Sequence, residues 1–400
     1  MRGSLLLHLS LVGALGACND LSAPAGGGGG LPDPVTLRLW RNSNARAYSR
    51  PLVVGQAVFF LTAGEHDVTA VNKTTGALLW KTHLVLPDPA FGGFGLAFGG
   101  GRLLVGDSEL FGLDPVTGAV VWQYVPSSGK HPGYRSLTSD GTIAYCGSGS
   151  GGYMYAVDGA TGTERWKAKI SPDTNVGVFN PVLDRGVVYA GFSDYQVPPG
   201  PYQSGRVFGG VSAVDAASGR ILWTTLLPHP DSASASTTEG VAVVNGRVFA
   251  GSLDGTLYAL DAATGAIMQS VPPAQFVFGG PRASGGDLKV FASTGSTLYV
   301  GSLFGTISAW SVSDLKRLWI KNIDSHGSVQ DLVADADLVY ANHVGGQLSV
   351  LKGADGATVW MIDAAALRNG FNLIAAAPAL DGDRIYLGGF QESYGMKKRP

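Results

Sequence analysis

Hydrophobic and polar residues alternate in short runs along most of the chain, and glycine or an Asn/Asp-Gly pair interrupts them at short intervals. The clearest example is Val243-Val244-Asn245-Gly246 followed by Arg247–Ser252, where an Asn-Gly pair joins two apolar runs. Runs of this length, bounded by such pairs, are typical of β-strands joined by tight hairpins. The pattern predicts an all-β protein made of many short strands.

A longer pattern repeats along the chain and predicts its architecture. Its full form is Tyr155-Ala156-Val157-Asp158-Gly159-Ala160-Thr161-Gly162, with Trp166 four residues after the glycine. The tryptophan position recurs, with glutamine in one copy, at Trp80, Trp122, Trp166, Trp223, Gln269, Trp319 and Trp360. Successive copies lie 42, 44, 57, 46, 50 and 41 residues apart. This is the size of one four-stranded blade of a β-propeller.

Each residue type in the repeat has a local physical role. The aspartate side chain can accept hydrogen bonds from backbone N–H groups just ahead of it, and the glycine supplies a positive φ for the hairpin. The tryptophan offers a large flat surface to the neighbouring blade. We therefore predict that the residues that dock one blade on the next are Trp40, Trp80, Trp122, Trp166, Trp223, Trp319 and Trp360.

The two ends of the chain predict how the ring closes. Asn372–Phe390 supplies two strands of a further blade, and too little chain follows for the other two. Val35–Trp40 resembles an isolated outer strand that is in step with the repeat. Joining the ends predicts an eight-bladed β-propeller of four-stranded antiparallel blades over residues 35–400, with the N-terminal strand closing the last blade. A seven-bladed ring with loose ends is the alternative. Closure would hide sheet edges that otherwise invite aggregation.

The first residues predict export and an anchor. Leu5–Leu15 is mostly apolar, as long as the hydrophobic part of a signal peptide, and shorter than the ~20 residues that span a bilayer. Leu15-Gly16-Ala17-Cys18 resembles the bacterial lipobox, in which the cysteine is lipidated on sulfur. We predict a lipoprotein signal peptide over residues 1–17, lipidation at Cys18, and a Gly/Pro-rich tether over residues 18–34. An ordinary cleaved signal peptide with an incidental cysteine is the alternative.

Composition and candidate chemistry mainly exclude functions. The chain has 28 Lys and Arg against 30 Asp and Glu, so it has no basic surplus for nucleic acid. Cys146 lies in a strand-like run and is expected to be a small buried hydrophobe. The histidines show no metal-ligand spacing, and no nucleophile elbow, phosphate loop or paired-carboxylate motif is evident. We expect no catalytic residue, no cofactor and no metal site.

The Ala-x-Asp-x-x-Thr-Gly-x-x-x-Trp pattern resembles the repeat of the quinoprotein alcohol dehydrogenases, the pyrroloquinoline-quinone-like propellers. Two branches share this repeat: the quinone-dependent dehydrogenases, and a non-catalytic branch that includes the propeller lipoprotein of the outer-membrane β-barrel assembly machinery. Fold alone does not choose between them. The dehydrogenase branch implies a disulfide between adjacent cysteines, a calcium site of Glu, Asn and Asp, and a catalytic Asp. This sequence contains no Cys-Cys pair and no matching motif for the other groups.

The resemblance therefore favours a non-catalytic, membrane-anchored binding or scaffolding propeller. It implies an exported chain, held by its lipid in the cell envelope at the outer membrane and facing the periplasm. It also implies a protein partner, such as an outer-membrane barrel protein. The alternatives are a periplasmic or cell-surface ligand-binding module, or a quinone-dependent dehydrogenase.

The loops predict which face meets the partner. In a four-stranded antiparallel blade, the first and third turns lie on one face, and here they are tight. The second loops and the connections between blades lie on the other face and carry nearly all the extra length, as in Ser193–Arg206. Aromatic residues on these long loops are expected to contact the partner, since aromatics are enriched in interfaces. They are Tyr134, Tyr195, Tyr202 and Phe276. The alternative is that long loops merely tolerate insertions.

Overall fold

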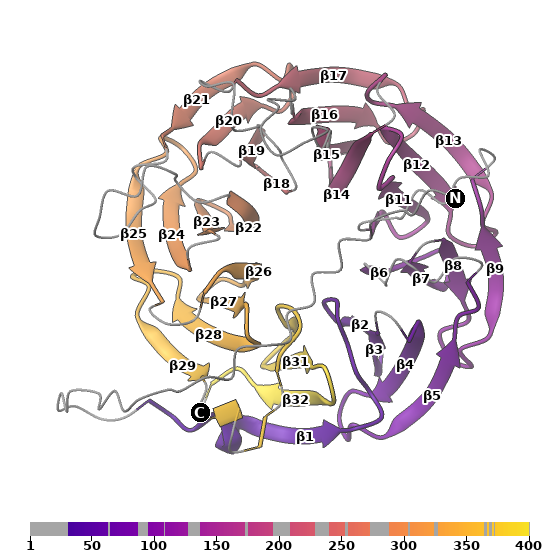
Figure 1. Cartoon of the computed structure of the whole chain (residues 1–400), viewed down its shortest axis with the longest axis vertical. Coiled ribbons are helices and arrows are strands. Elements are labelled where there is room, and N and C mark those ends of the chain that lie inside the picture. Colours follow the sequence, from indigo (N-terminus) through magenta and orange to yellow (C-terminus); the bar gives the residue numbers. More distant parts are fainter. Residues whose placement is uncertain are drawn as a thin grey trace, which may run out of the picture. The chain divides into compact units, whose positions relative to one another are not determined.

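The described residues form eight four-stranded antiparallel sheets, which are the blades of a ring (Figure 1). The computed structural model describes residues 31–399 apart from certain segments. The segments left out are 63–64, 87–94, 108, 127–136, 173–174, 195–208, 229–239, 253–254, 273–287, 303–304, 324–326, 364–365, 368–369 and 372. The predicted eight-bladed propeller is confirmed, and the seven-bladed alternative is wrong.

Seven blades are built from consecutive stretches of chain. Blades 1 and 2 consist of β2 (Leu52–Val54), β3 (Ala57–Leu61), β4 (Asp67–Asn72) and β5 (Leu78–His83), then β6 (Gly95–Gly99), β7 (Arg102–Gly106), β8 (Leu110–Leu113) and β9 (Val120–Tyr124). Blades 3 and 4 consist of β10 (Leu137–Ser139), β11 (Ile143–Gly147), β12 (Tyr153–Asp158) and β13 (Glu164–Lys169), then β14 (Val176–Asp184), β15 (Val187–Asp194), β16 (Gly209–Asp215) and β17 (Ile221–Leu226).

The next three blades follow the same order. Blade 5 consists of β18 (Val241–Val244), β19 (Arg247–Gly251), β20 (Leu257–Asp261) and β21 (Ile267–Val271). Blade 6 consists of β22 (Leu288–Thr294), β23 (Thr297–Ser302), β24 (Thr306–Ser311) and β25 (Arg317–Asn322). Blade 7 consists of β26 (Val329–Ala334), β27 (Leu338–His343), β28 (Gln347–Lys352) and β29 (Thr358–Ile362). We call the four strands of each blade A to D, from the innermost to the outermost in Figure 1.

Blade 8 combines both ends of the described chain. It consists of β30 (Ala379–Asp381), β31 (Arg384–Gly388), β32 (Ser393–Lys397) and, as strand D, β1 (Arg38–Asn42). β1 pairs antiparallel with β32, so the predicted closure by an N-terminal strand is confirmed. The strand begins three residues later than Val35 because Pro34–Leu37 forms the 3-10 turn η1. The side chain of Asp33 caps this turn by accepting a hydrogen bond from the Val35 N–H.

The register between strands C and D explains the small residue in the repeat. Ala156 on β12 lies opposite Trp166 on β13, and a β-bulge follows. In blade 8, Gly395 lies opposite Trp40, and a Cβ atom on this glycine would lie 2.4 Å from the indole ring. The indole therefore crosses the neighbouring strand, and only a small residue fits beneath it.

The hydrophobic core is divided among the junctions between blades. Between blades 1 and 2, Phe59 and Leu61 pack with Leu103 and Val105, and all four are buried. Fully burying a side chain of this kind stabilises the fold by roughly 1.5–3 kcal/mol. Cys146 is wholly buried between blades 2 and 3, as expected, and burial raises the pKa of its thiol.

Candidate functional site

Backbone hydrogen bonds place two sets of turns on one face of the ring. In blade 5, the Ala262 N–H in the C–D turn donates to the Gly246 carbonyl in the A–B turn, at 2.9 Å. In blade 4, the Ala216 N–H donates in the same way to the Gly186 carbonyl, at 2.9 Å. We call the face formed by the A–B and C–D turns the tight-turn face. The opposite face, formed by the B–C loops and the connections between blades, is the loop face.

The aspartates of the repeat hold the C–D turns together. Asp158 Oδ1 accepts hydrogen bonds from the backbone N–H groups of Ala160 and Thr161, both at 3.0 Å. Its Oδ2 accepts from Arg165 at 2.5 Å. The bond from Arg165 and then the bonds from Thr161 and Ala160 lower the pKa of Asp158, because they favour the charged form. Gly162 completes the turn with a φ of 73°. The carboxylate thus has a structural role.

Tryptophans close the junctions between blades. Trp122 in blade 2 donates from Nε1 to the Gly159 carbonyl in the C–D turn of blade 3, at 3.0 Å. A Cβ atom on Gly162 would lie 2.7 Å from the same indole, so this turn needs glycine for space as well as for its φ. Equivalent bonds join Trp40 to Lys73, Trp80 to Pro115, Trp166 to Ala216, Trp223 to Ala262, Trp319 to Gly353 and Trp360 to Lys398. All seven predicted tryptophans lie at such junctions.

The junction between blades 5 and 6 has a different pair of residues. Gln269 takes the place of the tryptophan, and its side-chain amide still donates to the C–D turn of the next blade, at the Asp314 carbonyl (3.1 Å). In that turn, Leu315 takes the place of the glycine, is 4% exposed and packs in the core between the two blades. The sequence pattern shows the glutamine, but not that Leu315 replaces the glycine at the same junction.

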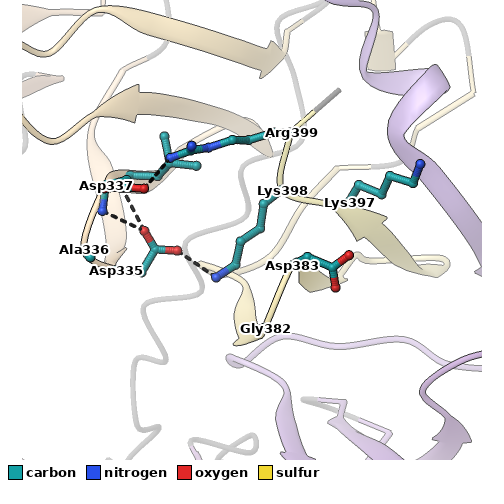
Figure 2. A pocket seen from close by; sticks show the side chains of 9 residues that line it. Asp335, Ala336, Asp337, Gly382, Asp383, Lys397, Lys398 and Arg399 are labelled. Carbon is teal, nitrogen blue, oxygen red and sulfur yellow. Dashed lines mark hydrogen bonds and ion pairs between the residues drawn. The ribbon is translucent and has the colours of Figure 1, made fainter.

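Ion pairs join blade 8 to its neighbours. On the tight-turn face, Lys398 Nζ lies 2.7 Å from Asp335 Oδ2, and Arg399 Nη2 lies 2.8 Å from Asp337 Oδ2, in the A–B turn of blade 7 (Figure 2). These residues line a pocket of about 540 Å³. Lys73 Nζ in blade 1 lies 2.8 Å from Oδ2 of Asp381, the last residue of β30 in blade 8. The two ion pairs marked in Figure 2, Lys398–Asp335 and Arg399–Asp337, thus help to hold the last blade.

Two further polar side-chain pairs lie between blades. Arg50 binds Asp331 through Nη2 at 2.5 Å and Nε at 3.3 Å, which connects the start of blade 1 to strand A of blade 7 across blade 8. Between blades 1 and 2, the buried His66 Nδ1 lies 3.0 Å from Asp107 Oδ2. None of these pairs was predicted from the sequence, because no local pattern links the partners.

Tyr134, Tyr195, Tyr202 and Phe276 of the expected partner face, and the expected lipidation residue Cys18, lie outside the described residues. Within the part of the chain that the structure describes, no group of three or more His, Cys, Asp or Glu side chains could hold a metal ion. In the same residues, no helix is long and apolar enough to cross a membrane.

The sequence matches a known protein family. The model of the family described as outer membrane protein assembly factor BamB matches residues 36–197 and 207–396. Among curated relatives, polyvinylalcohol dehydrogenase from Sphingopyxis sp. (strain 113P3) is 28% identical over 252 residues, which cover 60% of this chain. The match spans only 35% of the length of that enzyme.

Solved structures from both branches have the same propeller fold as this chain. BamB from Moraxella catarrhalis is 19% identical, with a TM-score of 0.58 over 77% of this chain and 84% of that chain. Quinohemoprotein alcohol dehydrogenase from Comamonas testosteroni is 14% identical, with a TM-score of 0.61 over 91% of this chain and 77% of that chain. At these identities the likeness shows the propeller fold alone.

Proposed function

Because this chain belongs to the family of outer membrane protein assembly factor BamB, we propose that it is a non-catalytic, membrane-anchored scaffold that binds a protein partner in outer-membrane protein assembly. The family match carries the proposal, since it spans both halves of the propeller. The described residues give it a second support. Their repeated polar groups, such as Asp158 and Trp122, are used in turns and junctions.

The proposal includes an anchor at Cys18. A lipidated Cys18 would hold the propeller at the outer membrane, facing the periplasm, through the tether of residues 18–34. Stable anchoring takes two acyl chains or a second membrane contact, because one chain binds only marginally. We expect a fatty-acid analogue to label the wild-type protein. The Cys18→Ser variant should lose both the label and its membrane association. Label that persists in this variant would contradict the anchor.

Affinity purification tests the partner. The full chain, carrying a C-terminal tag, is solubilised from cell envelopes in mild detergent, and its companions are identified by mass spectrometry. We expect an outer-membrane barrel protein among them. The Cys18→Ser protein, mixed with the same detergent extract, is the matched control, because partner binding should survive loss of the anchor. Recovery of no envelope protein by either form would contradict the scaffold.

A quinone-dependent dehydrogenase is the second candidate, favoured by the match to polyvinylalcohol dehydrogenase over 60% of this chain. Incubating the purified protein with pyrroloquinoline quinone and calcium distinguishes the scaffold from the dehydrogenase. The scaffold proposal expects neither tight quinone binding nor dye-linked oxidation of alcohols. A saturable submicromolar quinone complex would favour the dehydrogenase.

A further inference from the structure

The outer strand of blade 3 carries three exposed cations. Along β13, Trp166 and Ala168 are buried, whereas Arg165, Lys167 and Lys169, which lie before, between and after them, are exposed. Alternate residues of a strand point to the same face and lie about 6.7 Å apart. Lys167 and Lys169 therefore share one face of β13, and Arg165 lies exposed beside them at the β-bulge. We call these three cations along the rim of the ring the cation row.

The cation row is not a requirement of the repeat. The equivalent positions are Leu79, Lys81 and His83 in blade 1, and Leu222, Thr224 and Leu226 in blade 4. Lysines on an edge strand commonly protect a sheet against aggregation. Here, however, the outer strands β9, β17 and β21 carry no charged residue at all. A general protective role does not explain why the charges gather on β13.

Two of the three charges lack an acidic partner within the described residues. Arg165 binds Asp158, but Lys167 and Lys169 instead lie over one ring, with their Nζ atoms 5.2 and 4.6 Å from the centre of Tyr153. Lys169 Nζ also donates to the Gly151 carbonyl at 3.3 Å. Like charges gathered in this way repel each other, and an anion placed between them would relieve the repulsion.

The nearby carboxylate is already engaged. Glu164, at the start of β13, accepts a hydrogen bond from the hydroxyl of Tyr124 in blade 2. Burial and then this bond to Glu164 raise the pKa of Tyr124, so the hydroxyl keeps its proton and continues to donate. Within the described residues, Glu164 therefore accepts from a neutral hydroxyl and forms no ion pair with either lysine.

The backbone of β13 also has an open edge. β13 is the last strand of the sheet order β10-β11-β12-β13, so no strand of the described residues pairs with its outer side. Such an edge presents N–H and C=O groups to which an extended segment can add as a further strand. An added strand places its alternate side chains opposite those of β13, where opposite charges attract.

We propose that β13 is the docking site for an extended acidic segment of a protein partner, which adds as a fifth strand to blade 3 and sets carboxylates at alternate positions against the cation row. This rests on the proposed function only in taking the partner to be a protein. It adds the surface and the chemistry of the segment that is recognised: a strand with Asp or Glu at every second residue.

The test uses the full chain in detergent and a short labelled peptide with Glu at every second position. Binding is measured by fluorescence anisotropy at low and at physiological salt. We expect the Lys167→Glu/Lys169→Glu variant to bind about tenfold more weakly than wild type, with a smaller difference at high salt. The Lys316→Glu/Lys352→Glu variant makes the same charge change on the tight-turn face, and should stay within about twofold of wild type.

Further measurements keep the proposal open to contradiction. The neutral Lys167→Gln/Lys169→Gln variant should also bind weakly while melting at the wild-type temperature, and bound peptide should slow amide exchange in β13. Equal binding by wild type and the charge-reversed variant would overturn the proposal. So would equal binding of a peptide with its Glu residues clustered, because the strand spacing would then not matter.

The membrane is the competing occupant. Vesicles of phosphatidylglycerol that bind wild type but not the charge-reversed variant, with no peptide binding, would overturn the protein segment in favour of a lipid surface. Peptide binding and partner recovery are independent readouts. An envelope partner recovered equally by wild type and the charge-reversed variant would reject this docking site and leave the scaffold function intact.

Discussion

Two neighbouring junctions fill the same space with different residues: the junction between blades 4 and 5, and the junction between blades 5 and 6. In the first, Trp223 of blade 4 covers Gly265 of blade 5, where a Cβ atom would lie 2.5 Å from the indole. In the second, the smaller Gln269 side chain donates to a different carbonyl of the next C–D turn, that of Asp314, and the buried Leu315 replaces the glycine.

The comparison shows what the repeat preserves. Both junctions keep a hydrogen bond from strand D to the next C–D turn, and both fill the space between the blades. The large side chain comes from strand D in the first junction, and from the C–D turn of the next blade in the second. Leu315 adopts a φ of 51° where other copies have glycine, a conformation that costs a non-glycine residue about 1 kcal/mol or more. The stabilisation gained by filling the junction therefore outweighs the cost of this backbone conformation.

Removing a whole tryptophan junction should have the largest effect. Deleting residues 35–40 takes away Trp40 and two of the four paired positions of β1, and exposes part of the edge of β32. We expect the free energy of unfolding to fall by at least ~3–5 kcal/mol, the usual cost of truncating a large buried aromatic. Urea denaturation of the soluble Cys18→Ser form measures it. Deleting residues 19–24 of the tether is the matched control, and a closure deletion that melts like this control would contradict the junction account.

Converting the exceptional junction into an ordinary one should have a smaller effect. Gln269→Trp alone should destabilise by about 1–3 kcal/mol, because its indole meets Leu315. Leu315→Gly alone should cost about 2–4 kcal/mol, because it leaves a gap. The double variant should recover about 2 kcal/mol relative to the sum of the two.

The double variant has a matched control. Gln269→Trp combined with Leu39→Gly places the second change on β1 in blade 8, so the two effects should add. Urea denaturation of the single and double variants measures the coupling between the sites. Additive effects in the Gln269/Leu315 pair would show that the two positions do not share one space, and would remove the basis of the comparison.

These contacts also mark how far the sequence predicts the structure. The blades, their order and the closing strand follow from local signals, since an aspartate, a Thr-Gly turn and a tryptophan each have a role within a few residues. The bond from Gln269 to Asp314, and the ion pair of Lys398 with Asp335, join residues that are distant along the chain. No local pattern in one sequence identifies such partners. The cation row was missed for another reason: alternating charges on one strand matter only once its edge is known to be exposed.

The smallest predicted effect is a loss of folding stability in acid, which arises in the C–D turns of the repeat. The pKa of Asp158 is lowered from 3.8, first by its bond to Arg165, and backbone and side-chain bonds lower the pKa values of Asp114, Asp215 and Asp261. A carboxyl with a lowered folded-state pKa stabilises the fold above its unfolded value, and this contribution is lost as the pH falls through the lowered value. Wild type should therefore lose stability below about pH 4.

The aspartates can be tested one by one. Each Asp→Asn variant should be less stable than wild type at pH 7, and the difference should shrink as the pH falls from 5 to ~2. Urea denaturation over this pH range gives the two curves. Parallel curves for Asp158→Asn and wild type would contradict the assigned bonds. The C–D turn of blade 7 has Lys352 in place of the aspartate. Substituting Lys352 should therefore leave the pH dependence of the free energy of unfolding unaltered.

The central claim is that the ring is a scaffold for a protein partner, and the sequence predicts that the loop face meets it in addition to the segment proposed on β13. Site-specific crosslinking tests this claim most directly. Photoreactive residues are placed in living cells at Tyr202 and Phe276 on the long loops, and at Asn245 and Asp140 in the A–B turns of the tight-turn face. The account predicts that the loop positions capture one defined envelope protein and the tight-turn positions do not. Capture mainly from Asn245 and Asp140, or no defined product from any position, would contradict it.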